Sequence, residues 1–131
     1  MKTSEELVPF RVYTREDLKS MFEIKNATIN TGVFSPKGHD SIWLFVTEDK
    51  TADRVQYEDR LQRNTLYWEG QQQGRTDMTI IEHKQQGLEL LFFYRKKKYE
   101  HKGAGFRFEG KFKYVSHSGG VPTQFILKRV E

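Results

Sequence analysis

Residues 106–115 alternate apolar and polar side chains almost without interruption, and this pattern limits the fold more than any other in the chain. Strict alternation has the two-residue period of a β-strand with one buried face. Gly110 lies inside the pattern, and a glycine within a strand marks a bulge or a bend. The segment therefore predicts a half-buried strand that bends near its middle.

Several other short apolar or aromatic runs predict further strands. The run 41–47 is apolar without alternation from Ile42 to Val46, which is typical of a strand buried on both faces. None of the runs is long enough to cross a bilayer. The expected strands are 41–47, 54–57, 65–68, 78–82, 88–94 and 124–130, with an extended lead-in at 7–12, a loop over 25–40 and a turn over 83–87.

A single short helix is expected near the N-terminus. Thr14 precedes Asp17 by three residues, an arrangement similar to a capping box. Leu18, Met21 and Phe22 follow at the spacing of one helical face. With seven or so strands, this predicts a mainly β (α+β) fold, a small twisted β-barrel rather than a disulfide-linked sandwich or a βαβ sheet.

Length and composition restrict the class of protein. The 131 residues suffice for one modest core, so we expect one domain over 1–131 and no separate cofactor lobe. The chain has no cysteine, which excludes disulfides, thiolate zinc sites and a cysteine nucleophile. Its first ten residues lack the pattern of a signal peptide. A cytoplasmic protein without a membrane segment or a cofactor is expected.

The positive charge is concentrated in the last third of the chain. Residues 1–83 contain 11 basic and 14 acidic residues, whereas residues 84–131 contain 11 basic and 4 acidic residues. A basic segment that also contains many aromatic residues favours a polyanionic partner. The alternative is a solubilising surface over an ordinary core.

Signals for catalysis are few. The four histidines are scattered without metal-ligand spacing, and no nucleophile elbow or phosphate-binding glycine loop is present. Glu82 and Lys84 match the E-x-K pattern of metal-dependent nucleases, with Asp59 or Asp77 upstream as a second carboxylate. Lys84 also falls on a predicted turn, where a lysine is more often simply a solvated loop charge.

An aromatic segment indicates a different chemistry. A protein that inspects a DNA base extrudes it, stacks it between flat side chains and reads its edge through hydrogen bonds. Tyr57, Asp59 and Trp68 supply these residue types at short spacing. The alternative is that Tyr57 and Trp68 belong to the core and that Asp59 forms a turn. The run 95–98 and Lys102 offer phosphate contacts, or simply a solvated hairpin tip.

These residues resemble a known family. The chain is similar to the PUA-like readers of modified bases, and most specifically to the SRA-like domains found beside HNH nucleases or after superfamily II helicases. The resemblance covers about residues 11–130. It is carried by Tyr13-Thr14-Arg15-Glu16-Asp17-Leu18, Gly32-Val33-Phe34-Ser35-Pro36, Ile42-Trp43-Leu44-Phe45, Tyr57 with Asp59, Tyr67-Trp68-Glu69-Gly70-Gln71, His83 with Gly87, Leu90-Leu91-Phe92, Gly110-Lys111-Phe112-Lys113-Tyr114-Val115 and Phe125-Ile126-Leu127.

The resemblance implies a twisted β-barrel that grips duplex DNA and, in the SRA members, flips a modified cytosine such as 5-methylcytosine into a pocket. In those relatives a Tyr-x-x-Asp-like stretch and a later Tyr-Thr-Gly stretch line the pocket. Tyr57 and Asp59 match the first stretch with the acid two residues after the tyrosine. Trp68 stands in place of the later tyrosine, with Tyr67 as the other candidate, and no threonine follows.

We therefore expect a non-catalytic reader of modified double-stranded DNA in a restriction or phage-defence system, served by a separate nuclease or helicase module. The alternatives are a Mg²⁺-dependent E-x-K nuclease and a general DNA- or protein-interaction module. The expected base pocket comprises Tyr57, Asp59, Tyr67 and Trp68, and the expected backbone contacts are Lys37, Lys84, Arg95, Lys96, Lys97, Lys98 and Lys102.

Overall fold

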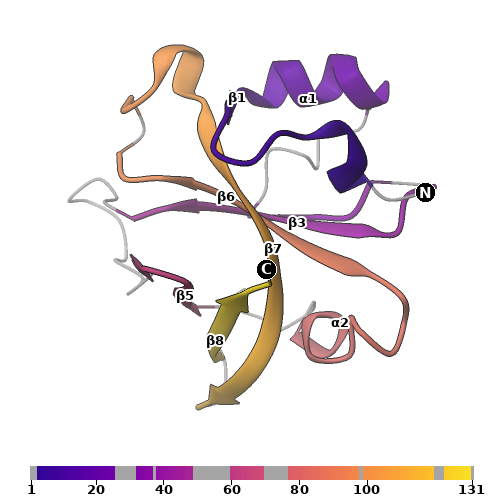
Figure 1. Ribbon diagram of the computed structural model, residues 1–131, viewed down its shortest axis with the longest axis vertical. Helices are drawn as coiled ribbons and strands as arrows, with labels where there is room; N and C mark the ends of the chain where they lie inside the picture. The colour runs from indigo at the N-terminus through magenta and orange to yellow at the C-terminus, as the bar shows by residue number, and fades with distance from the viewer. Residues whose placement is uncertain are drawn as a thin grey trace.

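The computed structural model describes residues 3–25, 32–36, 38–48, 60–69, 77–97, 99–119 and 123–130. Eight strands form one mixed sheet in the order β2-β3-β6-β7-β8-β5-β4, with β1 paired to β7 (Figure 1). The elements are η1 (Thr3–Glu6), β1 (Val12–Tyr13), α1 (Arg15–Phe22), β2 (Val33–Phe34), β3 (Ser41–Thr47), β4 (Arg60–Gln62), β5 (Thr65–Glu69), α2 (Asp77–Ile81), β6 (Glu89–Arg95), η3 (Lys102–Ala104), β7 (Phe106–Ser118) and β8 (Gln124–Arg129).

The predicted mainly β class is confirmed, but the sheet is open where a closed barrel was expected. Within the described ranges, no strand pair joins β2 at one end of the sheet to β4 at the other. Strands β3 and β6, next to the β2 end of the sheet, pair in parallel. The predicted fold, which excluded a βαβ sheet, had not included a parallel pair. Parallel strands are buried on both faces, which explains why 42–46 is apolar without alternation.

Two hydrophobic clusters lie on the two faces of β3 and β6. Alternate residues of each strand enter opposite clusters, because successive side chains of a strand point to opposite faces. The Trp43 cluster is covered by the N-terminal segment and α1, whereas β5, β8 and α2 contribute to the Phe92 cluster (Figure 1). The buried members of the Trp43 cluster are Leu7, Tyr13, Leu18, Phe34, Trp43, Phe45, Leu91, Phe93, Phe106 and Phe108. Those of the Phe92 cluster are Ile42, Leu44, Val46, Leu66, Trp68, Ile80, Leu90, Phe92, Phe112, Phe125 and Leu127.

The predicted N-terminal helix is confirmed as α1, together with its capping box. The Thr14 hydroxyl accepts a hydrogen bond from the Asp17 amide at 3.0 Å, and the Asp17 carboxylate accepts one from the Thr14 amide at 2.9 Å. Leu18 is fully buried, and Phe22 meets the Trp43 ring edge-on at 5.4 Å. The helix thus closes one end of the Trp43 cluster.

The bend predicted at Gly110 is confirmed as a β-bulge in β7. Phe92 pairs with Gly110 and Phe93 pairs with Phe108, so that Glu109 is one extra residue in β7. Gly110 has a φ of 97°, a conformation that favours glycine. The extra residue turns Phe108 into the Trp43 cluster and Phe112 into the Phe92 cluster. The bulge thereby allows β7, whose sequence alternates with a period of two, to contribute side chains to both clusters.

Two local predictions are wrong. Residues 77–81 form the helix α2 instead of a strand at 78–82, because a short apolar run has the same appearance in either structure. Ile80 is buried whereas Met78 is 59% exposed, so one side of a single turn faces the core. The expected loop over 25–40 contains the short strand β2. The strand expected at 54–57 lies outside the described residues. Among the helices of the described ranges, none is long and apolar enough to span a membrane.

Candidate functional site

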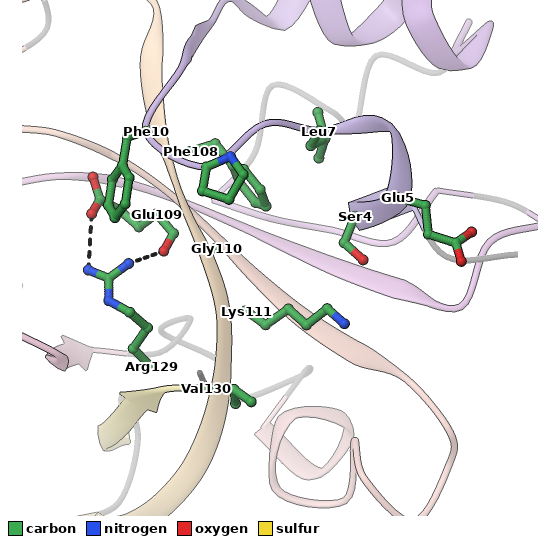
Figure 2. Close-up of a pocket in the computed structure, with 11 residues that line it drawn as sticks. Ser4, Glu5, Leu7, Phe10, Phe108, Glu109, Gly110, Lys111, Arg129 and Val130 are labelled. Carbon is green, nitrogen blue, oxygen red and sulfur yellow. Dashed lines mark hydrogen bonds and ion pairs between the residues drawn. The ribbon is translucent and has the colours of Figure 1, made fainter.

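An open pocket of about 490 Å³ lies beside the bulge of β7 (Figure 2). Its walls are the N-terminal segment 4–10 and the strands β7 and β8. Pockets of several hundred Å³ with apolar walls and a few polar groups are the usual form of small-molecule sites. We call it the bulge pocket; its lining includes Leu7, Phe10, Gly110, Lys111, Arg129 and Val130.

The bulge turns a fully buried carboxylate toward two arginines. Glu109 is 0% exposed, and its Oε2 accepts a hydrogen bond from Arg107 Nε at 2.5 Å. Its Oε1 accepts bonds from Arg107 Nη2 and Arg129 Nη2, each at 3.2 Å. Arg129 Nη1 also donates to the Glu109 carbonyl, as Figure 2 shows beside the pocket. A buried carboxylate needs such partners, because an unpaired buried charge is strongly destabilising.

The same contacts hold the two guanidinium groups in place. Hydrogen bonding to Glu109 raises the pKa of Arg107, so this side chain stays charged. Arg129 Nε donates to Asn64 Oδ1 at 3.0 Å, which leaves two of its five N–H donors without a described partner. Arg107 likewise has donors to spare. Of the two arginines, Arg129 lines the pocket, where its oriented donors suit acceptor atoms of a ligand, and Arg107 lies beside the Phe10 ring.

Phe10 places an aromatic ring at the mouth of the pocket. Its φ is 70°, a left-handed conformation that costs a non-glycine residue about 1–2 kcal/mol. The conformation is held by a bond of 2.6 Å from the Phe10 amide to the Phe108 carbonyl. Arg107 Cζ and Arg129 Cζ lie 5.2 and 5.3 Å from the ring centroid, yet 56% of Phe10 remains exposed. The ring is thus available to stack against a flat ligand.

A buried polar network anchors the N-terminal wall of the pocket. Ser4 donates to the Glu89 carboxylate from its amide at 3.0 Å and from its hydroxyl at 2.5 Å. The Ser41 hydroxyl donates to the same carboxylate at 2.6 Å, and Thr3 donates to Ser41. Trp43 Nε1 in turn donates to the Thr3 hydroxyl at 2.9 Å. These bonds attach the segment that carries Phe10 to β3 and β6.

Of the aromatic residues predicted for the base pocket, the two that the structure describes, Tyr67 and Trp68, do not line the bulge pocket. Trp68 is buried in the Phe92 cluster, with its ring 5.4 Å from that of Phe125. Tyr67 is half-buried and pairs with Ile126, so the two aromatic residues lie on opposite faces of β5. Tyr57 and Asp59 lie outside the described residues. The sandwich of Tyr57 and Trp68 therefore stays a prediction, and Trp68 occupies the core position given above as its alternative.

The predicted backbone contacts differ in their surroundings. Arg95 is buried and donates to Thr47 Oγ1 at 2.7 Å and to the Ala104 carbonyl at 2.8 Å. Its Cζ lies 4.0 Å from the Phe106 ring centroid, and burial lowers its pKa. The lysines Lys84, Lys96, Lys97 and Lys102 are exposed, whereas Lys37 and Lys98 lie outside the described residues.

The E-x-K residues do not end a strand. Glu82 follows α2, and its amide bonds to the Met78 carbonyl at 2.9 Å, while Lys84 lies in the following turn. The intervening His83 is buried, with Nδ1 2.7 Å from the Ile80 carbonyl oxygen. Within the described ranges, no group of three histidine or carboxylate side chains is placed to hold a metal ion.

The pocket residues were missed by sequence reasoning for different reasons. The glycine signal at 110 identified the bulge and could have drawn attention to Glu109 beside it. Phe10 and Arg129 carry no such signal, because their meeting depends on the pairing of distant segments.

The chain matches the family model described as "Domain of unknown function (DUF3427)" over residues 7–128. The chain belongs to the DUF3427 family. No curated protein matches it. Among solved structures, the DUF3427 chain is similar to a protein described as "Modification dependent TagI restriction endonuclease", with a TM-score of 0.52 and 17% sequence identity. The similarity covers 94% of this chain and 50% of that one, so the two share a fold over half of the endonuclease.

Proposed function

We propose that this DUF3427 chain is the DNA-binding reader of a modification-dependent restriction or phage-defence system. It binds double-stranded DNA and receives an extruded modified base, with a modified cytosine such as 5-methylcytosine as the expected ligand. The observation that carries the proposal is the bulge pocket, where an exposed aromatic ring stands beside two guanidinium groups held by a buried carboxylate. The fold shared with half of a modification-dependent endonuclease supports it.

Each part of the pocket has a distinct task in this proposal. Phe10 stacks against the face of the base, which compensates for the loss of stacking in the duplex. The free donors of Arg107 and Arg129 bond to acceptor atoms on its edge. Glu109 is a positioning residue, since its carboxylate is fully buried and orients both arginines. Pro9 and the exposed Val130 give apolar surface suited to a methyl group.

No chemical step is assigned to this chain in the proposal. Cleavage or strand separation comes from a nuclease or helicase module that the reader serves. The exposed lysines of the connection between β6 and β7 remain predicted phosphate contacts. Cleavage of plasmid DNA by the pure chain with Mg²⁺ or Mn²⁺, lost on Glu82→Ala, would contradict this division of labour.

The test compares duplexes that differ in a single cytosine, which is plain, 5-methylated or 5-hydroxymethylated. We expect binding to all three at low salt and tighter binding to at least one modified duplex. Phe10→Ala should abolish this preference, whereas Val8→Ala should keep it, because Val8 is exposed on the same segment but does not line the pocket. Equal affinity of the unaltered chain for all three duplexes would overturn the reader function.

A further inference from the structure

Three lysines gather on one face of β7 and β8, beyond the part of the sheet that the N-terminal segment covers. Lys113 and Lys128 are direct cross-strand partners, and Lys111 precedes Lys113 by two residues on the same face. All three side chains are exposed. We call this surface the lysine face, defined by Lys111, Lys113 and Lys128.

The arrangement of these lysines is unfavourable for the isolated sheet. Like charges placed directly opposite each other on neighbouring strands destabilise the pairing. The described residues of this face on β7 and β8 include no acidic side chain that would offset them. The acidic residue of β7, Glu109, forms ion pairs with Arg107 and Arg129 instead of with these lysines. An anionic partner would relieve the repulsion between Lys113 and Lys128.

The lysine face continues into the bulge pocket. Lys111 lines the pocket, and the Val130 amide, next to Arg129, bonds to the Lys111 carbonyl at 2.8 Å. At the other side, the Arg129 amide bonds to the Asn64 carbonyl at 2.7 Å, which brings the exposed turn residue Arg63 beside the end of β8. Cations therefore extend from the pocket mouth across β8 to the turn between β4 and β5.

We infer that the lysine face is the surface on which the backbone of duplex DNA lies. Residues two apart in a strand are separated by about 7 Å, which is about the through-space distance between neighbouring phosphates of one DNA strand. Lys111 and Lys113 therefore match phosphates spaced along one strand. A duplex placed there has a nucleotide at the mouth of the bulge pocket. This inference rests on the proposed function and adds to it the face that holds the DNA.

The test is the salt dependence of binding to an unmodified duplex. Each lysine–phosphate contact contributes roughly 0.9 to the slope of log affinity against log salt concentration. The double variant Lys113→Gln, Lys128→Gln should lower the slope by about 1.8 and weaken binding at 0.1 M salt by at least about tenfold. The matched control is the double variant Lys19→Gln, Lys25→Gln, which also removes two positive charges, one in α1 and one just after it. The salt slope of this control should equal that of the unaltered chain.

Lys113→Glu separates binding from folding. It replaces a repulsive cross-strand pair with an attractive one, so the sheet should be at least as stable while DNA binding weakens. The preference for a modified duplex, which depends on the pocket, should persist in every lysine variant. An unchanged slope in the double variant would overturn the lysine face and leave the reader proposal intact. Failure of the unaltered chain to bind any duplex at low salt, even if it binds heparin or an acidic protein, would overturn the proposed function itself.

Discussion

The molecule presents lysines in two regions that differ in how they are held. In the connection between β6 and β7, the segment that carries Lys96, Lys97 and Lys102 also contains a carboxylate. Glu100 accepts a hydrogen bond from the Lys96 amide at 2.8 Å and lies 3.3 Å from His101. On the lysine face, the cations project from paired strands. The connection thus offsets part of its own charge, whereas the described residues of β7 and β8 place no acidic side chain on the lysine face.

This difference affects what each region can contribute to binding. Groups on a paired strand lose little conformational freedom on binding, because the backbone is already ordered. The connection is itself held by a cation, since the buried Arg95 bonds to Thr47 and to the Ala104 carbonyl. Arg95 therefore has a structural role in the connection. We expect the lysines of the lysine face to make most of the contacts with phosphate.

The largest effect is expected where the bulge holds the pocket together. Glu109→Ala leaves Arg107 and Arg129 without their shared carboxylate, and we expect unfolding by urea to show a loss of about 3–5 kcal/mol. Glu109→Gln, which keeps the shape and an acceptor oxygen, should lose less. A loss below about 1 kcal/mol for the alanine variant would show that the carboxylate does not organise this side of the molecule.

Arg95→Ala tests the corresponding anchor of the connection. We expect a loss of about 2 kcal/mol in the free energy of unfolding, because two hydrogen bonds from a charged group disappear. The salt slope of DNA binding should stay that of the unaltered chain. A slope lowered by roughly 0.9 would instead make Arg95 a phosphate contact, as the sequence predicted.

The exposed lysines of the connection should have a smaller effect on binding than the lysine face. The triple variant Lys96→Gln, Lys97→Gln, Lys102→Gln removes three charges, and we expect the salt slope to fall by less than about 1. The reason is that we expect no more than one of these three lysines to contact a phosphate of a duplex held on the lysine face, and charges without such a contact are screened beyond about 8 Å at physiological salt. If the salt slope fell as much as in the Lys113 and Lys128 double variant, the connection would contribute at least as much to DNA binding as the lysine face, contrary to this prediction.

The smallest effects concern backbone strain at Ala104 in the connection and at Phe10 beside the bulge pocket. Phe10 and Ala104 have φ values of 70° and 56°, in the region that favours glycine. Ala104→Gly should raise stability by up to about 1 kcal/mol, and Phe10→Gly should be more stable than Phe10→Ala by a similar amount. Thermal unfolding measures both differences, and a less stable glycine variant at either site would contradict the assignment of strain there.

Several elements could be predicted because their signals are local. The capping box of α1 depends on residues three apart, and the bulge at Gly110 interrupts a strict alternation. The limits of β3 agree with the run 41–47 because that run is apolar on both faces. The apolar run near 77–81 was too short to distinguish a helix from a strand. In the structure these residues form α2, and Ile80 of this helix packs into the Phe92 cluster.

By itself, the sequence determined the mainly β class, the first helix and the strand that bends at Gly110. Each of these follows from the chemistry of neighbouring residues, which propensity and periodicity express directly. Only the tertiary structure decided that β3 and β6 run parallel, that Phe10 reaches Arg129, and that Lys128 stands opposite Lys113. Those relations depend on strand register between distant segments, and a shift of one residue would turn every side chain to the other face.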